Sequence, residues 1–584
     1  MATTRRVYLY GIALVALGML VAGLASLLEL LLQTLVAALG GLPAAVGPDQ
    51  ARGRVSYAAA LSAIGLVAWV VHWTLANRPL ARAADAPAER RAAIRKLFLY
   101  LVLLVGGLRL TFALSDLVRD LLRALFGRLA GADLLTGSVT HPVAVVAIVG
   151  VFWLYYARVA RADRAVAPEA GAGATLRRWY VYALAFVGLL LLLFGTVGAL
   201  EDLWAALVVP PGAVQSSAEW LGGALAGRLG AVAAGLAAWY LAWSASVAAF
   251  ERPDEPDPES RSTLRKVYLY LVLAVAVAWT VWNLGRTLYV LLRVALVPER
   301  LAGGWGAVVP DLGGPLVTAL VFGVAWAYHA RVVEHEAARA GERRRQAAIR
   351  WFYAYLVALV GLGALAVGLG GTLATLLDLA VQPGAPRETH WWADRISLFA
   401  TLVAVGLPLW AAYWQRLQRE AQEPLARDAL VRRIYLFLVF GLAVLTLLGS
   451  GAFALYQLLR RALGDTWSAG ATSELLAAAS AAAVAALFLA YHLRVLRAGA
   501  PPLAPPGALP ATPPGAAPRA ATPAAPAGPA APRLALAVVR AADPARLAAF
   551  ERELAARLPA GVELELLPLD AATAARLLAA AASP

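Results

Sequence analysis

The segment Arg5-Arg6-Val7-Tyr8-Leu9-Tyr10 decides the fold, because its pattern recurs along the chain and a long apolar run follows each copy. The pattern is a basic residue or pair followed by aromatic side chains two positions apart. The first aromatic residues of the copies are Tyr8, Phe98, Tyr180, Tyr268, Tyr353 and Tyr435. Each apolar run exceeds the roughly 20 residues that a helix needs to cross a bilayer. We therefore predict that every copy opens a membrane-spanning helix.

The composition indicates the same class of protein. Of the 584 residues, 61% are hydrophobic and 15% are charged, whereas a soluble domain has about 45–50% apolar and about 25% charged residues. A soluble globular enzyme is therefore nearly excluded. The chain contains no cysteine, which rules out disulfides, thiolate metal sites and cysteine nucleophiles.

A second apolar span follows each first one, after a loop that contains Gly or Pro. The second spans lie at about 57–77, 142–160, 228–250, 315–333, 396–415 and 474–493. Because each unit crosses twice, all units share one orientation, which disfavours the inverted repeats of many transporters. The predicted fold is an all-α polytopic membrane protein with about twelve transmembrane helices from six parallel two-helix repeats. The repeats are assigned to residues 1–90, 91–172, 173–260, 261–345, 346–427 and 428–497.

The basic residues predict the topology. Lys and Arg number 51 against 36 Asp and Glu, a net charge of +15, and they concentrate between the hairpins, as in cytoplasmic loops. We expect a multi-pass protein of the cell (inner) membrane, with both termini cytoplasmic and an uncleaved first span, rather than a nucleic-acid-binding protein. The basic openings are either topology signals or specific contacts to anionic lipid headgroups. The candidate headgroup contacts are Arg6, Lys96, Arg178, Lys266, Arg350 and Arg433.

The C-terminal region has a different composition. Residues 498–533 are rich in Pro, Ala and Gly, which predicts an extended linker. Residues 534–584 have the pattern of a small β-α-β-α domain, with strands at Leu534 to Val539 and around Leu564. A unit of this size is short for a core of its own. We therefore expect a small cytoplasmic α/β domain that forms a homo-oligomer or binds a cytoplasmic protein.

The recurring motif also resembles a known family. The chain resembles a bacterial multi-pass membrane family catalogued as domain of unknown function 5671. The shared features are the basic-x-aromatic-x-aromatic opening of each unit, the polar turn about 20 residues later, and an aromatic and basic cluster at the end of the second span, such as Trp326…His329…Arg331. The resemblance covers about residues 5–497, in six tandem hairpin repeats. The family has no assigned activity, so the resemblance implies a membrane location and no catalytic residue or cofactor.

Arg109 and Asp116 form the candidate intramembrane polar site. Arg109 lies eleven residues after Phe98, or roughly 16 Å into the membrane at about 1.5 Å per residue. A charge at that depth usually faces a bundle interior or a water-filled cavity. Asp116 follows two helical turns later on the same face. The pair is an anion or proton site, or a structural ion pair that holds helices together, or Arg109 is simply an arginine that reaches towards the headgroups.

Two other sets of polar residues recur at equivalent depths. Acids at the far ends of the first spans either attract cations as a ring or are ordinary acids at solvated helix ends; they are Glu29, Asp116, Glu201, Asp202 and Asp378. Histidines at the ends of three second spans suggest a metal or a pH sensor; they are His72, His329 and His492. Because Tyr156 and Ala242 occupy the same position in other units, we predict no metal, no cofactor and no catalytic residue.

The spans carry few polar residues and no catalytic constellation, so the leading hypothesis is a non-enzymatic integral membrane protein with a scaffold or interaction role and a tethered cytoplasmic domain. The alternative is a transporter or channel for a small or lipid-like solute that uses Arg109 and Asp116. An enzyme that acts on lipid is a more distant alternative.

Overall fold

The computed structural model describes one helical unit. It covers residues 2–41, 47–82, 84–129, 133, 137–208, 218–252, 257–302, 304–340, 344–383, 388–464 and 468–498. All of these residues belong to one compact unit, Met1–Pro501. They form helices joined by turns and contain no strand.

Twelve of the described helices are long and apolar enough to cross a membrane, which agrees with the number predicted from the sequence. They are α1 (Ala2–Gly40), α2 (Pro48–Asn77), α4 (Ala93–Leu125), α6 (Thr140–Val166), α7 (Ala172–Val208), α8 (Ala218–Phe250), α9 (Thr263–Leu296), α10 (Val309–Ala340), α11 (Arg344–Val381), α12 (Trp391–Glu420), α14 (Leu430–Ala462) and α15 (Ala469–Ala498). Shorter helices lie in the connections; they are α3 (Ala86–Arg91), α13 (Pro424–Arg427), η1 (Arg78–Ala81), η4 (Glu259–Arg261), η5 (Pro298–Leu301) and η6 (Trp305–Ala307). The protein is therefore a multi-pass membrane protein.

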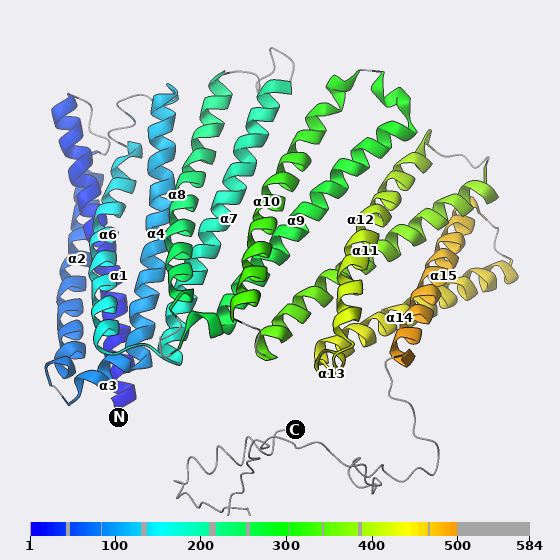
Figure 1. The fold of residues 1–584 in the computed structure, drawn as a ribbon. Coiled ribbons are helices and arrows are strands. Elements are labelled where there is room, and N and C mark those ends of the chain that lie inside the picture. Colours follow the sequence, from blue (N-terminus) through cyan, green and yellow to red (C-terminus); the bar gives the residue numbers. More distant parts are fainter. Residues whose placement is uncertain are drawn as a thin grey trace, which may run out of the picture. The chain divides into compact units, whose positions relative to one another are not determined.

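The long helices pair into six hairpins that follow one another in a row (Figure 1). The first helices of successive hairpins contact each other, so α1, α4, α7, α9, α11 and α14 form a continuous series. Each later second helix also packs on the first helix of the preceding hairpin, as α8 does on α4. All first helices begin on the same side of the row, which is the lower side in Figure 1. We call this side the basic end of the helices, because the recurring basic motif lies there.

Glycine contacts divide the hairpins into two kinds. In the first, third and fifth hairpins, a Cβ on a second-helix glycine would lie within 2.6 Å of a backbone nitrogen of the first helix, so these pairs pack backbone to backbone. The glycines and their neighbours are Gly65 with Leu20, Gly235 with Leu192, and Gly406 with Leu365. Gly150 in α6 and Gly323 in α10 meet only side-chain atoms, at 3.9 and 3.8 Å. The structural period is therefore two hairpins.

The fold class predicted from the sequence is wrong in its last part. The fold is all-α, because the described residues contain no strand. Residues 534–584, to which the β-α-β-α domain was assigned, and the predicted linker at 498–533, apart from Ala498, lie outside the described residues. An alternating apolar and charged pattern of five residues is a weak signal for a strand, because it does not exclude other conformations.

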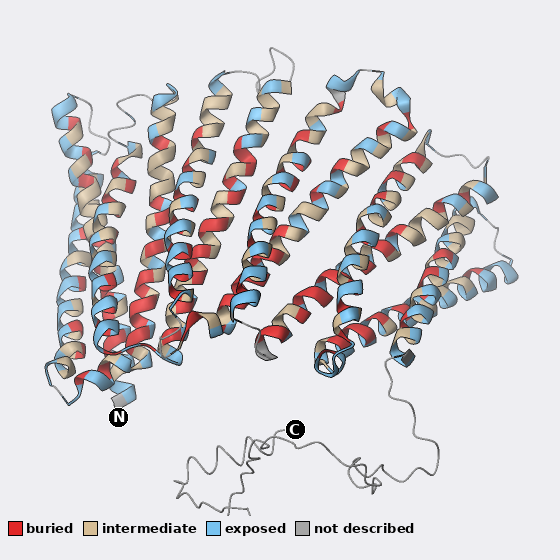
Figure 2. Cartoon of the chain, viewed as in Figure 1, coloured by how far each residue is buried: buried red, intermediate tan, exposed pale blue. Residues whose placement is uncertain are grey.

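Burial is not uniform along the helices. Figure 2 shows more buried residues near the basic end than near the opposite end. Charged side chains are among them, with Arg95 and Lys96 each only 1% exposed. Since a buried charge is stable only when it is paired and hydrogen-bonded, the basic end is where a polar site is expected.

Candidate functional site

A buried ion pair within the second hairpin also forms hydrogen bonds to the first hairpin at the basic end. Arg95 Nε donates to Asp163 Oδ2 at 2.7 Å, and its Nη1 donates to Tyr10 Oη at 3.0 Å and to Asn77 Oδ1 at 2.8 Å. Asp163 is itself buried, at 3% exposure. One guanidinium thus ties together α1, α2, α4 and α6, in the geometry that makes arginine–carboxylate pairs strong.

The same arrangement recurs two hairpins later. Arg265 Nε donates to Glu336 Oε1 at 2.8 Å, and its Nη1 lies 3.4 Å from Tyr182 Oη. Lys266 Nζ binds the other oxygen of Glu336 at 3.1 Å. Arg265 and Tyr182 hold the positions of Arg95 and Tyr10, so the first and second pairs of hairpins share one polar design.

Each pair of hairpins also contains a buried cluster of four rings, which we call its aromatic node. The nodes are Tyr10, Trp73, Phe98 and Tyr156; Tyr182, Trp243, Tyr268 and His329; and Tyr355, Trp414, Tyr435 and His492. The tryptophan of each node packs on the aromatic residue that opens the next first helix, at centroid distances of 5.5, 5.4 and 5.1 Å. These contacts bury large apolar areas and fix the spacing of the helices at the basic end.

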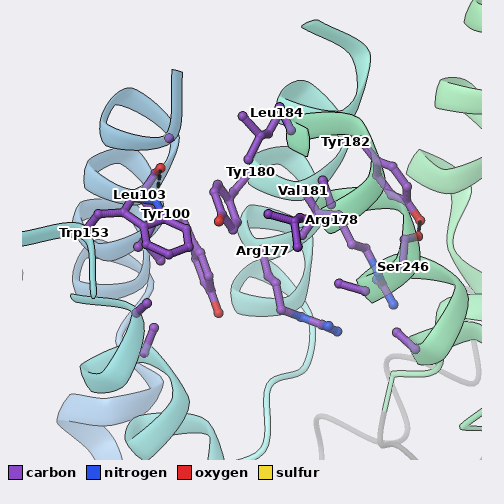
Figure 3. Close-up of a pocket in the computed structure, with 18 of the residues that line it drawn as sticks. Tyr100, Leu103, Trp153, Arg177, Arg178, Tyr180, Val181, Tyr182, Leu184 and Ser246 are labelled. Atoms are coloured by element: carbon purple, nitrogen blue, oxygen red, sulfur yellow. Dashed lines mark hydrogen bonds between the residues drawn. The ribbon is translucent and has the colours of Figure 1, made fainter. Parts of the chain in front are cut away.

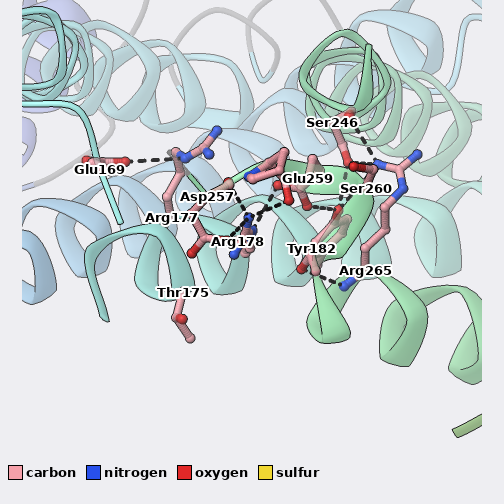
Figure 4. A network of polar contacts seen from close by, with 12 residues as sticks. Glu169, Thr175, Arg177, Arg178, Tyr182, Ser246, Asp257, Glu259, Ser260 and Arg265 are labelled. Atoms are coloured by element: carbon pink, nitrogen blue, oxygen red, sulfur yellow. Dashed lines mark hydrogen bonds and ion pairs between the residues drawn. The ribbon is translucent and has the colours of Figure 1, made fainter. Parts of the chain in front are cut away.

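Two further buried acids link neighbouring elements at the basic end (Figure 4). Glu169 binds Lys96 at 2.7 Å, accepts a 2.6 Å hydrogen bond from Tyr100 Oη, and pairs with Arg177 at 3.3 Å. Glu259 pairs with Arg178 at 2.9 Å and accepts a hydrogen bond from Tyr182. The two carboxylates thus hold α4 to α7 and the loop before α9 to α7.

Each of the six residues predicted to contact headgroups lies near a carboxylate of the protein, and three of the six are buried. Lys96, Arg178 and Lys266 are at most 6% exposed and bind buried carboxylates. Arg6 pairs with Glu89 at 2.9 Å and Arg350 with Glu420 at 2.5 Å. The sixth, Arg433, is well exposed and lies 3.9 Å from Asp428.

The structure does not bring the predicted intramembrane pair together. Arg109 is exposed on α4, whereas Asp116 Oδ1 accepts a 2.6 Å hydrogen bond from Arg119 on its own helix. Among the described residues, no group of three or more His, Cys, Asp or Glu side chains is placed to hold a metal ion. His329 and His492 instead bond through Nδ1 to the carbonyls of Ala325 and Phe488, at 2.8 Å each.

A groove opens between α4, α6, α7 and α8, at the junction of the first and second pairs of hairpins (Figure 3). Its volume is about 580 Å³. On α4 its lining runs from Tyr100 to Leu114, which is about 21 Å at 1.5 Å per residue. That length exceeds half of the roughly 30 Å hydrocarbon core, so the groove continues from the basic end past the middle of a bilayer.

The groove exists because the facing side of α8 is built from small residues. Its α8 lining is Ala234, Ala237, Ala238, Leu241, Ala242, Ala245, Ser246, Ala248 and Ala249. Methyl side chains cannot fill the space left by the larger residues of α4 and α7. The walls away from the basic end are apolar, with Leu103, Leu110 and Leu114 on α4.

The mouth of the groove is strongly basic. Its lining includes Arg161, Arg164, Arg177, Arg178 and Arg252 but a single carboxylate, Glu259, which is bound by Arg178. Arg161 and Arg164 are exposed, and neither has a carboxylate partner among the described residues. Guanidinium groups bind phosphate oxygens well. A groove with a basic mouth and apolar walls therefore suits an anionic amphiphile.

The acids that organise this end were not among the residues predicted from the sequence. Asp163 lies seven residues after Tyr156, and Glu336 lies seven residues after His329. This matched spacing was visible in the sequence and could have identified the two carboxylates. The groove left no such signal, because it depends on which face of α8 meets α4.

Comparison with known proteins gives the family but no characterised relative. No curated protein and no solved structure is significantly similar to the chain. The model of the family described as "Domain of unknown function (DUF5671)" matches three segments, residues 6–151, 178–313 and 352–490. Each segment starts in the first helix of an odd-numbered hairpin, so the model matches three units and not the six expected from the motif. The chain belongs to the DUF5671 family and contains three successive copies of its domain.

Proposed function

We propose that the protein is a non-enzymatic integral membrane protein that binds an anionic lipid in the groove between α4, α6, α7 and α8. The observation that carries this proposal is the combination of a basic mouth and apolar walls in one continuous groove. A phosphate at Arg161 and Arg164 would place an acyl chain along Leu103, Leu110 and Leu114. The lipid would then lie between the first and second copies of the domain and stabilise their junction, as expected of a scaffold.

The distribution of charge supports an orientation for this site. The first helices start with Arg or Lys at the basic end, and such residues favour the cytoplasmic side. We therefore place the basic end and both termini at the cytoplasmic face of the cell membrane. There the anionic lipids of the facing leaflet would supply the ligand. Residues 534–584 would lie on the same side and are proposed to bind a second copy or a cytoplasmic protein.

Transport of a lipid-like solute is the second candidate function. The length of the groove favours it, since the lining on α4 extends beyond one leaflet. The pair predicted from the sequence gives it no support, because Asp116 is bound to Arg119 and Arg109 is exposed. Lipid exchange between leaflets of proteoliposomes tests this candidate, and equal exchange with and without the protein would exclude it.

The binding proposal is tested by changing the mouth of the groove. Protein with Arg161→Gln and Arg164→Gln is compared with the Arg158→Gln variant, since Arg158 is exposed on the same helix but does not line the groove. Each basic residue near anionic lipid contributes about 1 kcal/mol, so the double variant should bind phosphatidylglycerol about 30-fold more weakly. Retained lipid is measured by native mass spectrometry. Equal retention in all three proteins would contradict the proposal.

A further inference from the structure

Arg432 occupies in the third copy the position of Arg95 in the first and Arg265 in the second. It opens α14 beside the third aromatic node, in which the rings of Trp414 and Tyr435 lie 5.1 Å apart. Tyr355 faces its guanidinium, as Tyr10 faces Arg95. Arg432 is buried, at 7% exposure. The third copy therefore has a buried arginine at the same position as the other two copies.

The third copy has no acid at the sequence position of the one that neutralises this cation in the other copies. The residue seven positions after His492 is Gly499, where the other copies have Asp163 and Glu336. Among the described residues, Arg432 contacts no carboxylate. Its Nη1 donates a 3.4 Å hydrogen bond to the carbonyl of Arg427, and its buried Nε has no partner.

Two acids that precede α14 in the chain, Glu420 and Asp428, have other cations as partners. Glu420 accepts hydrogen bonds from Arg350 at 2.5 Å, Trp351 at 2.9 Å and Arg416 at 3.2 Å. Glu420 thus pairs with Arg350 in the third copy as Glu259 pairs with Arg178 in the second. Asp428 lies near Arg433, at 3.9 Å. Neither carboxylate replaces the one that Arg95 and Arg265 bind.

A buried guanidinium must have an anionic partner to be stable, because it does not lose its proton in a protein. Arg427 and Arg433, which are close to Arg432 in the chain, are exposed and add further positive charge to this end of α14. A phosphate can accept from several donors at once and suits three arginines better than one carboxylate does. We propose that the third aromatic node binds a phosphate group at Arg432, in the position that Asp163 and Glu336 fill in the other copies.

The phosphate could belong to a lipid headgroup or to free phosphate, and two arms of one experiment distinguish these sources. Both use protein with Arg161→Gln and Arg164→Gln, so that the groove does not contribute. One arm titrates inorganic phosphate into detergent-solubilised protein, and the other adds phosphatidylglycerol or, as a control, phosphatidylcholine. The readout is the midpoint of thermal unfolding. A rise with inorganic phosphate identifies free phosphate, and a rise with phosphatidylglycerol alone identifies the lipid.

Two variants decide the outcome. Arg432→Gln should remove the ligand-dependent rise and leave the midpoint without ligand unchanged or higher, because it removes an unpaired charge. Gly499→Glu should raise the midpoint without ligand and abolish the response, because it puts a carboxylate at the sequence position of Asp163 and Glu336. Absence of any rise in the parent protein, or an equal rise in Arg432→Gln, would overturn the proposal. Since the groove is already altered, this result is independent of the proposed function.

Discussion

Trp73 Nε1 donates a 2.7 Å hydrogen bond to Tyr155 Oη and so links the end of α2 to the end of α6. The same bond, with the same length, joins Trp243 to Tyr328 and Trp414 to Tyr491. Each bond connects the two hairpins of one pair. Each pair of hairpins in this chain is thus a four-helix unit that a tryptophan and a tyrosine join near the basic end.

Removing the acceptor of this bond should weaken the unit. In Tyr155→Phe, the mostly buried indole N–H of Trp73 loses its partner, which costs about 1–3 kcal/mol. Thermal or denaturant unfolding in detergent measures the change. Tyr240→Phe is the matched control, because Tyr240 is exposed and has no hydrogen bond among the described residues. Equal stability of the two variants would contradict the structural role of the bond.

The buried ion pair of the second copy should be sensitive to loss of one partner. Arg265→Gln leaves Glu336 with Lys266 alone in a buried position, and breaking such a pair costs about 3–5 kcal/mol. The additional change Glu336→Gln should recover part of this loss. Asp49→Asn provides a control, since Asp49 pairs with Arg52 at an exposed site, where a pair contributes about 0–1 kcal/mol. A cost for Arg265→Gln no greater than for Asp49→Asn would contradict this account.

The close helix contact of the third hairpin can be tested with one methyl group. A Cβ at Gly235 would lie 2.4 Å from the backbone nitrogen of Leu192, so Gly235→Ala must separate α7 from α8. Overpacking of this kind costs about 1–3 kcal/mol. In Gly227→Ala the added methyl meets no atom within 4 Å, and this variant should be as stable as the parent protein or more so. A smaller loss for Gly235→Ala than for Gly227→Ala would show that the contact is not tight.

The helical fold could be predicted from the sequence because length and hydropathy alone define a membrane span. The helices found in the structure agree with the twelve spans derived from the recurring motif around Tyr8 and its equivalents. The two-hairpin period could not be read from that motif, since it opens every hairpin alike. It depends on helix contacts such as that of Gly235 with Leu192, which involve residues far apart in the chain.

The candidate site was harder to predict, because burial changes the role of a charge. Lys96 at a helix end resembles a headgroup contact in sequence, yet its side chain is enclosed and binds Glu169. Arg109 resembles a buried functional charge by its depth, yet the structure leaves it exposed on α4. Both differences depend on which face of α4 meets a neighbouring helix.

The central claim, that an anionic lipid lies in the groove, is tested most directly by quenching of a fluorophore on α4. The chain has no cysteine, so Leu114→Cys inside the groove and Phe112→Cys on the exposed face of the same helix can each carry a single label. Phosphatidylglycerol brominated on its acyl chains should quench the label at position 114 more strongly than brominated phosphatidylcholine does. Both lipids should quench the label at position 112 equally. Equal quenching by both lipids at position 114 would contradict binding of an anionic lipid in the groove.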